Sequence, residues 1–134
     1  TIKSTNKAVQ IVGSIFANEN NLQNCLLLND VKNVIEALNG NLFMLKDSIL
    51  TTPPISEGCL NGIMRKQIFA FAKEMDIEIQ EAPISPFDLQ KADELFVTNV
   101  ISGIQSISKY RKKDFENVLA TKLVQFLNQR FNLI

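Results

Sequence analysis

Three features of the sequence carry residue types that could do chemistry together: a lysine, a glutamate and a pair of loops. Lys3 precedes a stretch with helical periodicity, and burial lowers the pKa of a lysine so that its free amine can form a Schiff base. Glu36 ends a short apolar run, where its carboxylate could pair with a protonated ring nitrogen of a cofactor. The loops 62–64 and 99–101 lie at expected element boundaries, where backbone N–H groups can bind an anion such as phosphate.

Each feature also has an ordinary structural explanation. Most lysines and glutamates are solvated, so Lys3 fits a surface position and Glu36 fits an exposed strand end. Gly58 and Gly62 fit residues that only shape a loop, and Asn99 fits a simple transition from strand to loop. The residue types alone leave both explanations open.

The block from Thr52 to Arg65, Thr-Pro-Pro-Ile-Ser-Glu-Gly-Cys-Leu-Asn-Gly-Ile-Met-Arg, is the stretch around which the chain is organised. Its two prolines end the preceding element and hold the chain extended. After Gly62, apolar residues recur at helical spacing and predict a helix over 63–75. A glycine-bearing loop that opens a helix presents unpaired N–H groups and the positive end of the helix dipole. This pattern predicts an anion site, and phosphate is the usual anion.

The composition narrows the classes of function. The 134 residues suit one domain, and 46% hydrophobic with 21% charged residues predicts a globular core. Fourteen basic and fourteen acidic residues cancel, which does not favour nucleic acid or an anionic membrane as a partner. The chain has no histidine, which rules out Ser-His-Asp and Cys-His catalysis and histidine-based metal sites within it. Two cysteines are too few for a disulfide framework and suit a reducing, cytoplasmic location.

Periodicity and turn residues predict an α+β domain with a largely antiparallel sheet. Helices are expected over 6–20 and 63–75, from Ser85 or Pro86 to 92, and over 115–131. Strands are expected over 25–28, 34–36, 42–45, 49–50, 95–97 and, at an edge, 77–81. The segment 98–103 is expected to be a polar loop, and 109–113 a basic surface turn.

Five segments in this order resemble the class IV aminotransferases. These are fold-type IV pyridoxal-phosphate enzymes, which include branched-chain and D-amino acid aminotransferases and aminodeoxychorismate lyase. The resemblance covers nearly the whole chain and implies a strand pseudo-barrel with helices packed outside. The segments are Lys3 to Asn6, Leu26-Leu-Leu-Asn29, Glu36 with Asn41-Leu-Phe43, the Thr52 to Arg65 block, and Ala92-Asp-Glu-Leu-Phe-Val-Thr-Asn99.

The resemblance implies a role for each residue that could hold pyridoxal 5'-phosphate. Lys3 would be the Schiff-base lysine and would move the substrate proton. Glu36 would keep the pyridine nitrogen protonated, so that the ring works as an electron sink. The backbone N–H groups of Ile63 and Met64 would bind the cofactor phosphate at the helix start.

A second loop would complete the site. The resemblance implies that Asn99 and Val100 close the phosphate site and that Val100 and Ile101 face a substrate carboxylate. Branched-chain aminotransferases usually carry threonine where this chain has Met64 and Val100, so two phosphate-binding hydroxyls are missing and the backbone donors remain. A proline usual in the family is replaced by Ser106.

The resemblance implies that residues 1–134 are the larger, C-terminal, cofactor-binding domain, without the small N-terminal domain that carries a phosphate-binding arginine. The spacing around Lys3 and the Asn61–Arg65 segment favour aminodeoxychorismate lyase, which releases 4-aminobenzoate and pyruvate from 4-amino-4-deoxychorismate. The alternatives are a branched-chain or D-amino acid aminotransferase, and an inert folded fragment. The expected partners are a small-molecule amino substrate and, as the resemblance implies, a second copy in a homodimer, without nucleic acid or membrane.

Overall fold

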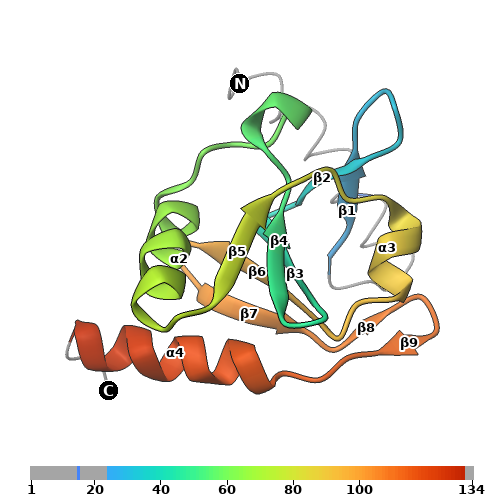
Figure 1. Ribbon diagram of the computed structural model, residues 1–134. Coiled ribbons are helices and arrows are strands. Elements are labelled where there is room, and N and C mark those ends of the chain that lie inside the picture. The colour runs from blue at the N-terminus through green and yellow to red at the C-terminus, as the bar shows by residue number, and fades with distance from the viewer. Residues whose placement is uncertain (1–14, 16–23, 132–134) are drawn as a thin grey trace.

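Five strands form the central sheet, in the order β5-β4-β3-β6-β7 (Figure 1). All neighbours pair antiparallel except β4 and β5, which are parallel. The computed structural model describes residues 15 and 24–131, so Lys3 and nearly all of the helix expected over 6–20 lie outside the described residues. The strands are β3 (Asn41–Lys46), β4 (Ile49–Thr52), β5 (Glu78–Glu81), β6 (Glu94–Asn99) and β7 (Gly103–Ile107).

One face of this sheet is covered by α2 (Ile63–Glu74) and α4 (Val118–Arg130). Side chains of β3 and β6 alternate between the two faces, so every second residue contributes to the core beneath these helices. Phe43 stacks on Phe96 with ring centroids 5.2 Å apart, and Phe71 meets Phe126 edge-on at 5.1 Å. The first contact joins β3 to β6, and the second joins α2 to α4.

The other face is covered by a hairpin of β1 (Leu26–Leu28) and β2 (Val34–Ala37) together with α3 (Pro86–Gln90). Ser85 caps α3, because its hydroxyl accepts from the Asp88 N–H while the Asp88 carboxylate accepts from the Ser85 N–H. A second core therefore lies between the central sheet and the β1–β2 hairpin, and the helices pack on the outer side of these strands. The α+β, largely antiparallel architecture expected from the sequence is confirmed.

The structure also corrects several sequence-based expectations. The segment 98–103, expected as a polar loop, ends β6 and begins β7, a strand that was not expected. The basic segment 109–113 is largely exposed, as expected, and forms a hairpin of β8 (Lys109–Tyr110) and β9 (Lys113–Asp114). The last helix begins at Val118 rather than near Phe115, because the Phe115 N–H donates to the Ser108 carbonyl and extends the hairpin.

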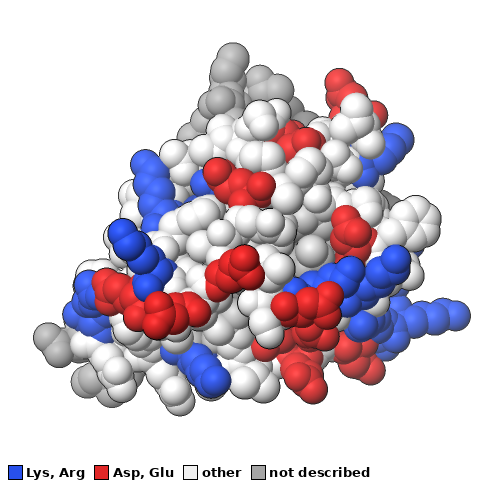
Figure 2. Space-filling view, viewed as in Figure 1, with Lys and Arg blue, Asp and Glu red and all other residues white. Residues whose placement is uncertain are grey.

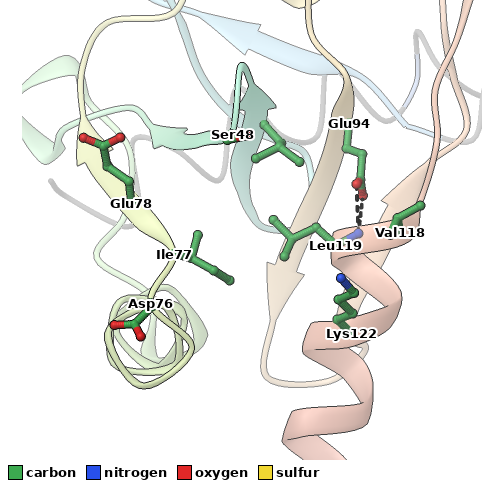
Figure 3. A pocket seen from close by; sticks show the side chains of 9 residues that line it. Ser48, Asp76, Ile77, Glu78, Glu94, Val118, Leu119 and Lys122 are labelled. Carbon is green, nitrogen blue, oxygen red and sulfur yellow. Dashed lines mark hydrogen bonds between the residues drawn. The ribbon is translucent and has the colours of Figure 1, made fainter.

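A buried glutamate fixes the start of α4. Glu94 is 3% exposed, and its carboxylate accepts hydrogen bonds from the Leu119 N–H at 2.8 Å and the Ala120 N–H at 3.2 Å (Figure 3). The first N–H groups of a helix have no partner within the helix. A negative charge beside them interacts favourably with the positive end of the helix dipole. Glu94 therefore ties the beginning of β6 to the helix that covers it.

The visible surface carries both signs of charge. Lysines and arginines alternate with aspartates and glutamates across the face in Figure 2 without a large area of one sign. Within the described part of the chain, no helix is long and apolar enough to cross a membrane.

Replacing Glu94 tests the carboxylate cap. The variant Glu94→Gln keeps the shape of the side chain and removes its charge, so we expect the free energy of unfolding to fall by about 1–2 kcal/mol. Urea denaturation measures this change. The matched control is Glu78→Gln on exposed β5, which should change the free energy by less than about 0.5 kcal/mol. Equal effects of the two variants would contradict the role of Glu94 in holding α4.

Candidate functional site

Glu36 lies on β2 with its side chain 2% exposed, which excludes the surface strand end considered from the sequence. The strand pairs with β1, where Glu36 faces Leu27, and the Ala37 N–H donates to the Gly40 carbonyl at 2.9 Å. A buried carboxylate needs hydrogen-bond donors. Glu36 Oε1 accepts from the Leu60 N–H at 2.9 Å, so the carboxylate reaches the loop that opens α2.

The start of α2 presents backbone donors. Gly62 is its N-cap residue with φ −67° and ψ 155°, and as a glycine it has no side chain that could cap the helix. Ile63 begins the helix and is 65% exposed. The first N–H groups of α2 therefore have the character of an anion site. The other two described α-helices contrast with it, because α3 is capped by Ser85 and α4 by Glu94.

A buried arginine, Arg65, binds the proline-rich segment that precedes α2. The Arg65 side chain is buried, donates to the Pro53 carbonyl at 3.1 Å and forms an ion pair with Glu81 of β5. At the end of the short 3₁₀ helix η1 (Ile55–Glu57), Gly58 adopts φ 115°, a conformation that favours glycine. The extended chain thus turns back toward Glu36 before α2 begins.

Cys59 lies inside this turn. It is fully buried, and its Sγ lies 3.5 Å from the Pro53 carbonyl oxygen. Burial raises the pKa of the Cys59 thiol, and the positive charge of Arg65 only partly opposes this while the carboxylate of Glu36 adds to it. The thiol is therefore neutral near pH 7 and is suited to packing rather than to nucleophilic attack.

The second predicted loop follows β6 directly. Asn99 ends the strand, and its Oδ1 accepts from the Ile101 N–H at 2.9 Å and the Ser102 N–H at 2.7 Å. Val100 and Ile101 are 65% and 94% exposed. The Asn99 side chain thus occupies two backbone donors of its own loop. One of them, the Ile101 N–H, belongs to a residue that the sequence assigns to substrate binding.

Asn41 joins these pieces and was not singled out as a site residue from the sequence. It is 6% exposed, and its amide Nδ2 donates to the Leu60 carbonyl at 2.7 Å. A Cβ atom at Gly62 would lie 2.6 Å from Asn41 Oδ1, so any other residue at position 62 would force this amide to shift. The signal for Asn41 in the sequence was a polar residue directly before the apolar segment 42–45.

The two loops meet at Asn41. In the β3–β6 pair Asn41 lies opposite Thr98, so the two side chains point to the same face of the sheet. Thr98 Oγ1 is buried and has no hydrogen-bond partner in the described part of the chain. The structure therefore brings together Glu36, the α2 start and the end of β6.

Two surface hollows lie away from Glu36 and from the start of α2. One of about 390 Å³ lies around Glu94, at the opposite end of β6 from Asn99, and is lined by side chains that include Ser48, Asp76 and Lys122 (Figure 3). A second, of about 450 Å³, lies at the β8–β9 hairpin. Neither is lined by Glu36 or by the start of α2. Within the described residues no cluster of acidic, cysteine or histidine side chains could hold a metal ion.

The arrangement suits one kind of ligand. A buried carboxylate can hold a protonated ring nitrogen, and uncapped helix N–H groups can hold a phosphate. Among the described residues, the buried hydroxyl of Thr98 at the end of β6 has no hydrogen-bond partner. These residues fit a phosphorylated pyridine.

Comparison with known proteins gives a consistent set of relatives. The family model described as amino-transferase class IV matches residues 1–110. A putative branched-chain-amino-acid aminotransferase of Methanocaldococcus jannaschii is 32% identical over 130 residues, which are 97% of this chain and 45% of that protein.

Solved structures agree. The crystal structure of a putative 4-amino-4-deoxychorismate lyase from Legionella pneumophila superposes with a TM-score of 0.87 at 28% identity, over 92% of this chain and 47% of that one. An aminotransferase from Brucella abortus, solved bound to the cofactor PLP, shares the fold with a TM-score of 0.83 at 24% identity, over 91% of this chain and 44% of that one.

This chain thus spans less than half the length of these relatives. The family match, the relative and the shared fold agree with one another. The chain belongs to the class IV aminotransferases, a family of pyridoxal-phosphate-dependent enzymes.

Proposed function

We propose that this chain is the cofactor-binding, C-terminal domain of a pyridoxal-phosphate enzyme that acts on a small amino substrate. One observation carries the proposal: the Leu60 N–H, three residues before the first residue of α2, donates to the buried carboxylate of Glu36. A carboxylate for the ring nitrogen and N–H donors for the phosphate therefore belong to one connected piece of structure.

Each residue has a defined task in this proposal. When bound, pyridoxal phosphate supplies an electron sink for the carbon next to the substrate amine. Glu36 keeps the ring nitrogen protonated, and the N–H groups of Ile63 and Met64 hold the phosphate. Asn99 and Val100 close the phosphate site from the second loop. The amine of Lys3 would hold the cofactor and would move the substrate proton.

Phosphate capture in this chain depends on the backbone. Met64 and Val100 provide no hydroxyl, so the uncapped N–H groups of α2 and the positive end of its dipole provide the attraction. The exposed side chains of Val100 and Ile101 make the neighbouring surface apolar. We assign that surface to the substrate side of the site.

We propose conversion of 4-amino-4-deoxychorismate to 4-aminobenzoate and pyruvate as the reaction. The segments around Lys3 and Asn61–Arg65 favour the lyase, and the Legionella lyase superposes over nearly the whole chain. Transfer of the amino group of a branched-chain amino acid is the second candidate, because the Methanocaldococcus relative matches 97% of the chain. D-amino acid transfer is a further alternative.

Two properties of the whole protein follow from the same proposal. The protein acts in the cytoplasm, and two copies associate as a homodimer. The alternative is that residues 1–134 fold but are inert when they are produced alone.

Lys3 provides the direct test of the cofactor site. Pyridoxal phosphate added to the protein should give an absorbance band at the edge of the visible, and Lys3→Ala should abolish it. Lys7→Ala, a lysine four residues further along, should keep the band. A folded protein without any band would support the inert fragment.

Glu36→Gln separates charge from shape. The amide oxygen can still accept from the Leu60 N–H, while the negative charge for the ring nitrogen is lost. We expect kcat to fall by about two to three powers of ten with a change in melting temperature of only a few degrees. Steady-state kinetics and thermal unfolding measure the two effects. Unchanged turnover would refute the role of Glu36 at the ring nitrogen.

Product analysis separates the two reactions. The protein that contains this chain should release 4-aminobenzoate and pyruvate from 4-amino-4-deoxychorismate, measured by chromatography. The comparison assay follows amino transfer from a branched-chain amino acid or from D-alanine to 2-oxoglutarate. Transfer without any release of 4-aminobenzoate would overturn the lyase assignment and leave the cofactor site intact.

A further inference from the structure

The backbone of Leu60 is held from two sides. Its N–H donates to Glu36 Oε1 at 2.9 Å, and its carbonyl accepts from Asn41 Nδ2 at 2.7 Å. Leu60 stands two residues before Gly62, where α2 begins. The position of the helix start relative to Glu36 therefore depends on Asn41.

Asn41 also limits which residue can occupy position 62 and how closely the backbone approaches there. Its Oδ1 occupies the space that a Cβ at Gly62 would enter, at a distance of 2.6 Å. The amide thus holds the Leu60 carbonyl with its nitrogen, and its oxygen packs against the first backbone unit of α2. These two contacts fix where the N–H groups of Ile63 and Met64 lie.

Asn41 is itself fixed by the sheet. It starts β3 opposite Thr98 of β6, and a Cβ at Gly40 would lie 2.2 Å from the Thr98 carbonyl oxygen. The Ala37 N–H donates to the Gly40 carbonyl, which joins the strand of Glu36 to the start of β3. Asn41 is 6% exposed, so its amide is buried and held in place.

Resting on the proposed function, we propose that Asn41 is a positioning residue that sets the spacing between the ring-nitrogen carboxylate and the phosphate-binding start of α2. A phosphorylated pyridine has a fixed span, so both of its ends bind well only when this spacing matches. Asn41 acts through Leu60 and Gly62. The contact with the Leu60 carbonyl needs a side-chain donor, which the asparagine amide supplies.

Aspartate at position 41 is the sharpest probe because it has nearly the same shape. It has no donor for the Leu60 carbonyl, and it adds a negative charge beside the phosphate donors. The matched control is Asn39→Asp, two residues away on an exposed turn. The Asn39 Oδ1 only accepts a hydrogen bond, from Asn24 Nδ2 at 2.8 Å, and aspartate keeps that acceptor.

The experiment compares binding of pyridoxal phosphate with binding of pyridoxal, which lacks the phosphate, in the protein that contains this chain. For Asn41→Asp we expect affinity for pyridoxal phosphate to fall by about 10- to 100-fold and affinity for pyridoxal by less than about threefold. Asn39→Asp should leave both affinities unchanged. Thermal unfolding of the cofactor-free variants reports any general loss of structure.

A double-mutant cycle tests the contact with Gly62. Gly62→Ala alone should weaken binding of pyridoxal phosphate, because its Cβ collides with the Asn41 amide. In an Asn41→Ala background that collision is gone, so the two losses should combine to less than their sum. This cycle decides the matter if Asn41→Asp does not fold.

The outcomes separate the two proposals. If the unaltered protein binds neither compound, the proposed function fails and the role of Asn41 fails with it. If the unaltered protein binds pyridoxal phosphate, but Asn41→Asp matches its control or weakens both compounds equally, the positioning role alone is overturned. Additive losses in the cycle would overturn it as well.

Discussion

The close backbone contact between the start of β3 and the end of β6 is the constraint from which the candidate site follows. A Cβ atom at Gly40 would lie 2.2 Å from the Thr98 carbonyl oxygen, so the two strands can meet this closely only because Gly40 has no side chain. The contact sets Asn41 opposite Thr98. Asn41 then reaches Leu60 and limits the approach of Gly62. Three segments far apart in sequence are thereby brought to one end of the sheet.

The elements that could be predicted from the sequence have their cause within a few residues. The short apolar segment of β3 and the helical spacing after Gly62 gave the right element types, and Ser85 with Pro86 marked the start of α3. The left-handed conformations of Asp47 and Ser48, at φ 51° and 67°, make the turn that their residue types predicted. Here the local preferences and the final fold agree.

The features that could not be predicted are set by distant partners. β7 carries few apolar residues, and its pairing with β6 makes it a strand. The start of α4 is placed by Glu94, which precedes it by more than twenty residues. Asn41 was named from the sequence only as part of a segment that resembles the family, and its contacts with Leu60 and Gly62 come from residues far along the chain. Lys3, the residue with the most specific predicted chemistry, lies outside the described residues.

Two buried glutamates show why residue type and strand position do not by themselves identify a site. Glu36 is the next-to-last residue of β2 and Glu94 is the first of β6, and each carboxylate accepts from a backbone N–H. Glu94 caps α4 directly, so the chain supplies its own anion to that helix. Glu36 binds the loop before α2, whose N-cap residue, Gly62, has no side chain that could cap this helix. At α4, a carboxylate of the chain itself thus binds the first N–H groups of the helix. At α2, an external anion can take that place.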